Sequence, residues 1–282
     1  MKFLRGGLFA LLITVITSGG WMFNSAVADE GQVYTLGVVP QFDSRKILSI
    51  WRPILDEIEQ QSGIRIRLQG SPSIPRFEKE FQAGQFDFAY MNPYHMLKAH
   101  NAQGYRPLVR DHGRQLHGIL VVHKDNSVIE LSELEGQTVA FPAPNALGAS
   151  LMLRAELQGK RKLNIEPLYV KSHTSVYLNV VTGMAVAGGG VQKTLSQQPA
   201  EIRDQLRVLH RTAKVSPHPL AAHPRVPAKV VEQVEQAILS LGDSESGRDM
   251  LRKIPIKQIG RAQINDYQPL EKLGLESYYV KD

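Results

Sequence analysis

Hydrophobic positions in the first third of the chain alternate between a strand period and a helix period. Val33–Val39 is rich in β-forming residues and is followed by a loop over Pro40–Ser44. The next apolar residues recur every three or four positions and form one helical stripe, comprising Ile47, Leu48, Trp51, Ile54, Leu55 and Ile58. Gly63 ends this helix. The alternation continues with a strand at Ile64–Leu68, a helix at Ile74–Phe81 and a strand at Phe86–Tyr90, and Pro93 marks the start of another helix.

A second series of strands and helices follows a long apolar strand at Ile119–Val122 and a polar stretch at Lys124–Ser127. Its expected elements are Thr138–Phe141, Ala146–Leu157, Ile165–Val170, Ser175–Val181 and Ala185–Ala187. Beyond them the pattern predicts a strand at Leu206–Leu209, followed by a proline-rich segment at Ser216–Pro227. Two helices, at Ala228–Leu241 and Ser244–Lys253, and an irregular tail complete the chain.

This order of elements predicts an α/β protein with mixed, mostly parallel sheets and helices on both faces. Two lobes joined by two crossings, near residues 120–124 and 210–216, fit the layout. We expect lobe 1 to comprise residues 29–121 and 213–282, and lobe 2 to comprise residues 122–212.

Residues 1–28 have the pattern of a cleaved signal peptide. Lys2 and Arg5 precede an apolar run at Leu8–Ile16, and Ala26-Val27-Ala28 forms a small-x-small cleavage site. An uncleaved membrane anchor is the alternative, but Thr17–Gly20 interrupts the run before the roughly 20 residues that span a bilayer. We therefore expect export with cleavage.

Cleavage would leave 282 − 28 = 254 residues and would lower the formal net charge from +6 to +4. So small an excess does not indicate a nucleic-acid partner. The chain contains no cysteine, which excludes disulfides, thiolate metal sites and cysteine nucleophiles.

The stretch VAFPAPNALGAS, residues 139–150, runs from a strand into a helix that begins with small residues. Asn145 is a favourable N-cap residue, and Ala146, Leu147 and Gly148 form the first turn. Free amides and the helix dipole allow such a turn to hold an anion without a basic side chain. An ordinary capped helix is the alternative from these residues alone.

A second helix start is expected at Ser172–Ser175, with Tyr177 one turn later. His173 could donate to an anion there, and binding would favour its protonated form. Affinity would then weaken as pH rises through the bound-state pKa of His173. A surface or capping histidine is the alternative.

Aromatic and amide side chains follow the strand at Phe88–Tyr90, where open α/β sheets bind ligands. Tyr90 is the first candidate for a ligand hydroxyl contact and Asn92 the second. Gln41 and Phe42, in the loop after the first strand, would face the same cleft, although each could also be a simple turn residue.

Several segments in register resemble the phosphate, phosphite and phosphonate group of periplasmic substrate-binding proteins. They are GVVPQFDSRK (37–46), FDFAYMNPYH (86–95), GQTVAFPAPNALGAS (136–150), SHTSVYLNVVTGMAVAGGGV (172–191) and HPLAAHPRVP (218–227). The resemblance covers nearly all of the chain after residue 28, and it implies a two-lobe, type II periplasmic-binding-protein fold with a two-segment hinge. It also implies a ligand partner in an interlobe cleft and a periplasmic location.

The resemblance also bears on the ligand. These proteins hold their oxyanion at the helix start with a short Ser/Thr run, whereas the matching positions here are Asn145, Ala146 and Leu147. Backbone amides and Asn145 would then hold the anion. Many relatives carry an acidic residue near Val186 that pairs with a ligand amine, and its absence here implies a ligand without one.

Two other motifs carry weaker signals. Gly183–Gly190 lacks the Gly-Lys-Ser/Thr ending of a nucleotide P-loop, so its glycines more plausibly allow the backbone to approach a ligand or the other lobe. Three histidine pairs share a five-residue spacing that a helix does not bring together, which is weak evidence for metal: His95/His100, His112/His117 and His218/His223. Family position makes His218 a cleft or hinge candidate, and no metal or cofactor is expected.

The leading hypothesis is a non-enzymatic, monomeric receptor that captures a small oxyanion, such as phosphite, phosphate or a phosphonate, and delivers it to an ABC permease. A sensory protein that presents the oxyanion to a membrane sensor histidine kinase needs the same cleft and is the alternative. An exported hydrolase using Ser172 and His173 is a remote third hypothesis, because the chain has no Gly-x-Ser-x-Gly elbow.

Overall fold

The computed structural model describes Met1 and residues 31–281. The predicted signal peptide, residues 1–28, lies outside the described residues except for Met1. Among the helices of the described part, none is long and apolar enough to cross a membrane.

The first sheet has six strands in the order β11-β4-β10-β3-β1-β2. β1 pairs in parallel with both β2 and β3, whereas β10 runs antiparallel between β3 and β4, and β11 is antiparallel to β4. The strand bounds are β1 Val33–Val38, β2 Arg65–Gln69, β3 Phe88–Tyr90, β4 Arg106–Asp111, β10 Leu220–Ala222 and β11 Ile259–Arg261.

The second sheet has five strands in the order β7-β6-β8-β5-β9. β6 is parallel to β7 and β8, and β5 is antiparallel to β8 and β9. The strand bounds are β5 Gly118–His123, β6 Thr138–Phe141, β7 Glu166–Tyr169, β8 Ala187–Val191 and β9 Leu206–Arg211.

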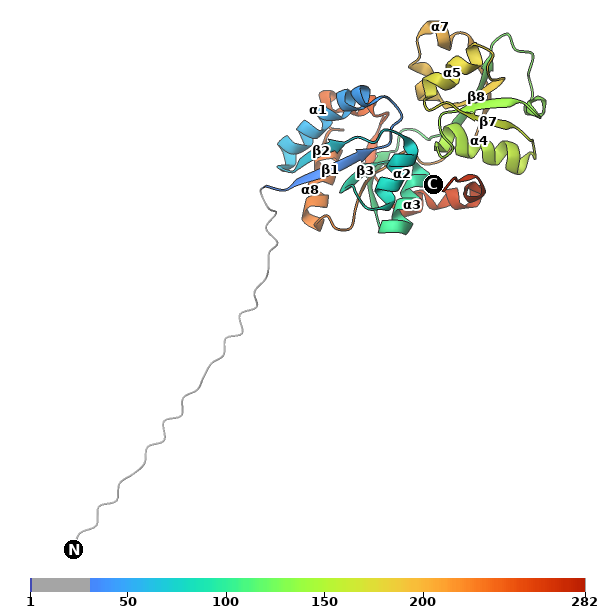
Figure 1. Cartoon of the computed structure of the whole chain (residues 1–282). Coiled ribbons are helices and arrows are strands. Elements are labelled where there is room, and N and C mark those ends of the chain that lie inside the picture. Colours follow the sequence, from blue (N-terminus) through green and yellow to red (C-terminus); the bar gives the residue numbers. More distant parts are fainter. Residues whose placement is uncertain (2–30, 282) are drawn as a thin grey trace. The chain divides into compact units, whose positions relative to one another are not determined.

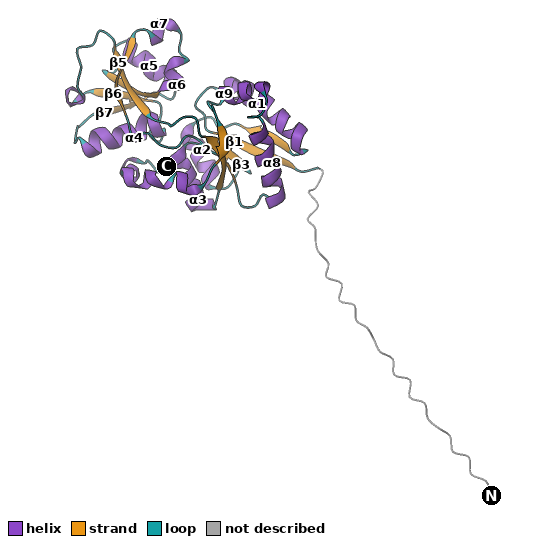
Figure 2. Ribbon diagram, turned by 180° about the vertical axis from the view of Figure 1, so that it is seen from behind, coloured by secondary structure: helices purple, strands orange, loops and turns teal. Residues whose placement is uncertain are grey.

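Helices cover both faces of each sheet (Figures 1 and 2). The α-helix bounds are α1 Ser44–Ser62, α2 Ile74–Gln82, α3 Pro93–Gln103, α4 Met152–Arg154, α5 His173–Val181, α6 Gln192–Ser196, α7 Ala200–Arg203, α8 Ala228–Ser240 and α9 Glu245–Lys253. Short 3₁₀ segments are η1 Leu131–Leu134, η4 Ile264–Asp266, η5 Gln268–Leu273 and η6 Leu275–Tyr278. Wide π-type turns, η2 Leu147–Leu151 and η3 Ala155–Lys160, flank α4, so residues 147–160 form one continuous helical run.

Side chains of the central strands alternate between two apolar layers. In β3, Phe88 packs in the layer of α1 and α8, whereas Ala89 packs in the layer of α2 and α3. In β5, Leu120 packs toward α4 and Ile119 toward α5. Strands buried on both faces read as continuous apolar runs, which explains why these two were visible in the sequence.

Two segments connect the sheets, residues 112–117 and 212–219. They pair with each other through an isolated antiparallel bridge in which Leu116 N donates to Val215 O and Val215 N to Leu116 O, at 2.9 and 2.8 Å. The division into two lobes remains a prediction. If each sheet is the centre of one lobe, β5 places the first boundary before Gly118 rather than after Val121.

The α/β fold class is confirmed, while several individual elements differ from the sequence pattern. β4, β10 and β11 were not predicted, and β10 lies inside the segment expected to be a proline-rich loop. Its three residues are too few to show a period, and pairing with strands on both sides supplies its hydrogen bonds. The tail expected to be irregular contains three short 3₁₀ segments.

Candidate ligand-binding site

The helical run that begins at Leu147 lies directly against the second sheet, and glycines make this approach possible. A β-carbon placed on Gly189 of β8 would lie 1.8 Å from Ala149 O, and one on Gly118 of β5 would lie 1.9 Å from Gly148 O. No side chain fits in either gap. The sequence suggested that the glycines of Gly183–Gly190 approach a ligand or the other lobe, but Gly189 instead admits this helix start. None of Gly188, Gly189 and Gly190 lines a described pocket.

The first turn of this helix leaves amides free. Ser150 N and Leu151 N both donate to Ala146 O, at 2.8 and 3.1 Å. In the described part of the chain, the amides of Leu147, Gly148 and Ala149 donate to no protein acceptor. Unpaired donors at a helix start carry a partial positive charge and attract anions.

These amides border a small cavity of about 20 Å³, the inner cavity. Its lining residues are Val39, Gln41, Ile74, Asn92, Leu116, Ala146, Leu147, Gly148, Ala149, His173, Val191 and His218. Ile74 is the first residue of α2, Asn92 caps α3, and His173 is the first residue of α5. The starts of four helical segments therefore converge on one space that no lysine, arginine or carboxylate lines.

His173 is held by a hydrogen-bond chain. Its Nδ1 lies 3.2 Å from Thr194 Oγ1, which lies 2.7 Å from the Tyr177 hydroxyl and donates to Val191 O at 2.9 Å. Burial lowers the pKa of His173 to about 4, so the ring is neutral in the free protein near neutral pH. The predicted loss of affinity with rising pH stays a prediction, and it now requires the bound anion to raise this pKa.

His218 and Gln41 form the opposite wall of the cavity. Gln41 Nε2 lies 2.8 Å from His218 Nε2, and because the amide nitrogen can only donate, the ring nitrogen accepts. Burial lowers the pKa of His218 to about 3. The ring of His218 also stacks on Tyr90, with centroids 5.6 Å apart.

A larger space, the outer chamber, adjoins the inner cavity and shares Gln41, Leu116, Val191 and His218 with it. Its volume is about 620 Å³. The remaining lining residues are Phe42, Tyr90, Asp111, His112, Gly113, Arg114, Gln115, His117, Gln192, Lys193, Thr194, Ser196, Lys214, Pro217, Pro255 and Ile256.

The structure gathers most of the residues that the sequence singled out. The inner cavity is lined by Gln41, Asn92, Ala146, Leu147, Gly148, His173 and His218. Phe42 and Tyr90 line only the outer chamber, and the Tyr90 hydroxyl already donates to Ile254 O at 3.0 Å. Tyr177 lines neither space, and its hydroxyl is linked to the His173 ring through Thr194 Oγ1.

Sequence reasoning missed other lining residues. The pair Ser73 and Pro75 marks the start of α2 and could have indicated Ile74. Leu116 and Val191 carry no chemical signal and enter the site only through the folding of the chain. Among the described residues, no group of three or more histidines and acids is placed to hold a metal ion.

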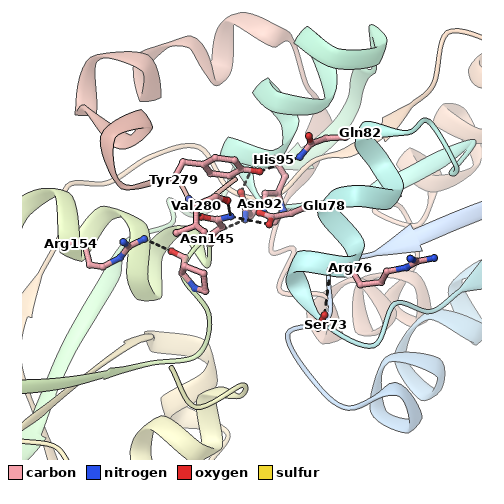
Figure 3. A network of polar contacts seen from close by, with 11 residues as sticks. Ser73, Arg76, Glu78, Gln82, Asn92, His95, Asn145, Arg154, Tyr279 and Val280 are labelled. Atoms are coloured by element: carbon pink, nitrogen blue, oxygen red, sulfur yellow. Dashed lines mark hydrogen bonds and ion pairs between the residues drawn. The ribbon is translucent and has the colours of Figure 1, made fainter. Parts of the chain in front are cut away.

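Asn145 does not cap the helix, so that prediction was wrong. The N-cap residue is Ala146, without a side-chain cap, because the Asn145 side chain is used elsewhere (Figure 3). Its Nδ2 donates to Glu78 Oε2 at 2.9 Å and to Val280 O at 2.8 Å, and its Oδ1 accepts from Val280 N at 2.9 Å. These bonds leave the amides of the turn, rather than the Asn145 side chain, to face a ligand.

The bonds of Asn145 belong to a network that fixes the first turn of the helical run, residues 146–149, to three other segments (Figure 3). This turn is the candidate anion turn. Glu78 Oε1 of α2 lies 2.7 Å from His95 Nε2 of α3. Arg154 donates to Pro144 O and to Tyr278 O, both at 2.7 Å, and so connects the helical run to the C-terminal segment. Asn92 Nδ2 donates to Asn145 O at 3.4 Å, and Asn92 is the one residue named in this network that also lines the inner cavity.

Replacing Asn145 tests this network. We expect Asn145→Ala to lower the free energy of unfolding by about 2 kcal/mol, because buried Glu78 and the backbone of Val280 lose their partner. Urea unfolding measures the change. Asn164→Ala, at an exposed position, is the matched control and should stay within about 0.5 kcal/mol of the parent protein. Equal stability of the two variants would contradict the role of Asn145.

The chain matches a family model described as the periplasmic substrate-binding protein of an ABC phosphonate transporter, over residues 36–267. The chain therefore belongs to this family of periplasmic binding proteins. A search of curated proteins found no match.

Solved structures share the fold at low sequence identity. A binding-protein component of an ABC phosphonate transporter from Pseudomonas aeruginosa is 15% identical, with a TM-score of 0.78 over 86% of this chain and 85% of that one. A Prochlorococcus marinus protein in complex with methylphosphonate is 14% identical, with a TM-score of 0.77 over 88% and 99%. A Xanthomonas citri protein bound to ATP is 18% identical, with a TM-score of 0.73 over 88% and 99%. At these identities the likeness establishes the type II binding-protein fold.

Proposed function

We propose that this chain captures a small oxyanion of the phosphate, phosphite or phosphonate class in the inner cavity and delivers it to an ABC importer. The observation that carries the proposal is the convergence of four helical starts on a compact space with no charged side chain. Amide donors and helix dipoles supply the positive potential that such an anion needs.

The ligand would be held by both halves of the molecule. Asn92 and Ile74 come from segments packed on the first sheet, whereas Gly148 and His173 come from segments packed on the second. A ligand that contacts both halves stabilises the arrangement in which they meet, and that arrangement is what an importer would recognise.

Two other functions receive less support. The family description names an ABC transporter, so delivery to a permease is favoured over presentation to a sensor kinase. Substrate-binding proteins of this family are receptors rather than enzymes, and the Ser172 hydroxyl serves as the N-cap of α5, where it accepts from Ser175 N. A hydrolase with Ser172 as nucleophile has no support in this arrangement.

Binding of small oxyanions tests the proposal directly. We expect phosphate, phosphite or methylphosphonate to raise the melting temperature, because a ligand at about 100 times its dissociation constant adds roughly 2.7 kcal/mol of stability. If none of the three binds, the proposed function is wrong.

A negative charge at residue 146, in the candidate anion turn, should weaken this binding. We expect Ala146→Asp to bind the best of these anions about 30-fold more weakly than Ala146→Asn, since only the carboxylate repels the ligand. The two side chains have nearly the same size, so calorimetry on the pair separates charge from steric blocking. Equal affinities of the two variants would show that the anion does not bind at residues 146–149.

A further inference from the structure

The outer chamber carries an excess of positive charge that the inner cavity lacks. Arg114, Lys193 and Lys214 line it. They come from separate parts of the chain: Arg114 lies in the connecting segment 112–117, Lys193 in α6, and Lys214 in the connecting segment 212–219. Asp111 is the one carboxylate among the lining residues.

Asp111 is paired with Arg114 and leaves the two lysines without a carboxylate partner among the described lining residues. Its Oδ1 accepts from Gly113 N and Gln258 N, at 2.9 and 2.8 Å, and its Oδ2 accepts from Arg114 Nε at 3.0 Å. In the part of the chain that the structure describes, no carboxylate lies within ion-pair distance of Lys193 or Lys214. Two lysines at the chamber therefore have no internal counter-charge.

The lysine on α6 lies where positive charges accumulate. Lys193 is half-buried, and its pKa is lowered by burial and, to a smaller extent, by the charges of Arg114 and Lys46. A cation in such a position is disfavoured unless an anion joins it. Because Asp111 is bonded to Arg114, an anion that pairs with Lys193 would come from outside the chain.

The chamber also suits a carbon chain. Phe42, Pro217 and Ile256 give it apolar walls, and its volume of about 620 Å³ falls in the range of pockets that hold organic ligands. Gln41 and His218 line both spaces and are hydrogen-bonded to each other at 2.8 Å, so this pair separates the chamber from the inner cavity. A ligand whose head occupies the inner cavity reaches the chamber with its substituent by displacing this pair.

We propose that the outer chamber binds a second anionic group, so that the ligand is a phosphonate or organic phosphate with a carboxylate or phosphate on a short carbon chain. The inference rests on the proposed function, because the oxyanion head must occupy the inner cavity. Lys193 is the principal partner of the second group, and Lys214 adds to the attraction. An ammonium group in the same place would be repelled.

Three ligands that share one head test the proposal by calorimetry on the full chain: 3-phosphonopropionate, propylphosphonate and 3-aminopropylphosphonate. We expect 3-phosphonopropionate to bind about tenfold more tightly than propylphosphonate, the size of one charge-assisted hydrogen bond. The aminated ligand should bind more weakly than propylphosphonate. A carboxylate that brings no gain, or an amine that binds best, would overturn the inference.

Substitution of the lysine locates the effect. In Lys193→Gln the ratio of the affinities for 3-phosphonopropionate and propylphosphonate should fall toward one, whereas Lys193→Arg should keep most of it. Lys229→Gln makes the same chemical change at an exposed position of α8 outside both spaces and should keep the full ratio. An unchanged ratio in Lys193→Gln would overturn the assignment and would favour a docking role for these cations.

The same series separates the two proposals. If propylphosphonate binds and the carboxylate adds nothing, only the outer chamber is wrongly assigned. If neither these ligands nor phosphate binds, the proposed function fails and this inference fails with it.

Discussion

Gly189→Ala should destabilise the protein by at least about 3 kcal/mol and should abolish binding of the oxyanion. The new β-carbon would lie 1.8 Å from Ala149 O and 2.7 Å from Phe141 Cδ1, and the first of these neighbours is backbone that cannot rotate away. Either β8 or the helix start must move by more than 1 Å to restore an ordinary contact, at the upper end of the cost of overpacking. Because Ala149 belongs to the candidate anion turn, the same movement displaces the amides that would hold the ligand.

Gly70→Ala is the matched control for this change. A β-carbon at Gly70 meets no atom within 4 Å, so this variant should be as stable as the parent protein or slightly more stable. Chemical denaturation measures both variants, and calorimetry measures their binding. A Gly189→Ala protein within about 1 kcal/mol of the parent would show that the helix start does not press on the sheet.

Acid should destabilise the protein through His173, and His173→Gln should remove this part of the effect. The folded-state pKa of His173, about 4, lies below its unfolded value near 6.5, so the unfolded chain takes up the proton first as pH falls. Stability is therefore full above about pH 6.5 and is lost as pH falls toward 4. At pH 4.5 the loss due to this one residue amounts to about 2.5 kcal/mol.

Comparing the parent protein with His173→Gln isolates the contribution of His173 to the loss of stability in acid. Urea unfolding at about pH 7.5 and about pH 4.5 gives each protein a pH-dependent loss, and carboxylates that titrate in this range contribute equally to both. The parent should lose about 2.5 kcal/mol more than His173→Gln. Equal losses would mean that His173 is accessible to protons in the folded state. A saturating oxyanion should reduce the difference, because a bound anion raises the pKa of a nearby histidine.

Much of the fold could be predicted from the sequence, because a two-sided apolar strand and an amphipathic helix each leave a local pattern. The stripe from Ile47 to Ile58 became α1, and Ile119–Val122 became the centre of β5. β4, β10 and β11 were missed because edge or inserted strands of three to six residues receive their hydrogen bonds from neighbours and need no internal period.

Some features of the candidate site could also be predicted from local sequence, whereas others depend on contacts between distant residues. Helix starts are local features, so the turns at Ala146–Gly148 and His173 could be recognised from cap residues and small side chains. The use of Asn145 could not be recognised, since its partners Glu78 and Val280 lie 67 and 135 positions away along the chain. The side chain of Asn145 makes three hydrogen bonds in this buried network instead of capping the helix.

By itself, the sequence determined most of the strands, the long helices and the helix starts with small residues, because backbone preference and apolar period act over a few residues. Only the tertiary structure decided that four of those starts border one cavity, that β8 glycines admit a helix backbone, and that Lys193 lies in a chamber without a free carboxylate. These are properties of distances between residues remote in the chain, and they are fixed by the packing of two sheets and the two crossings between them.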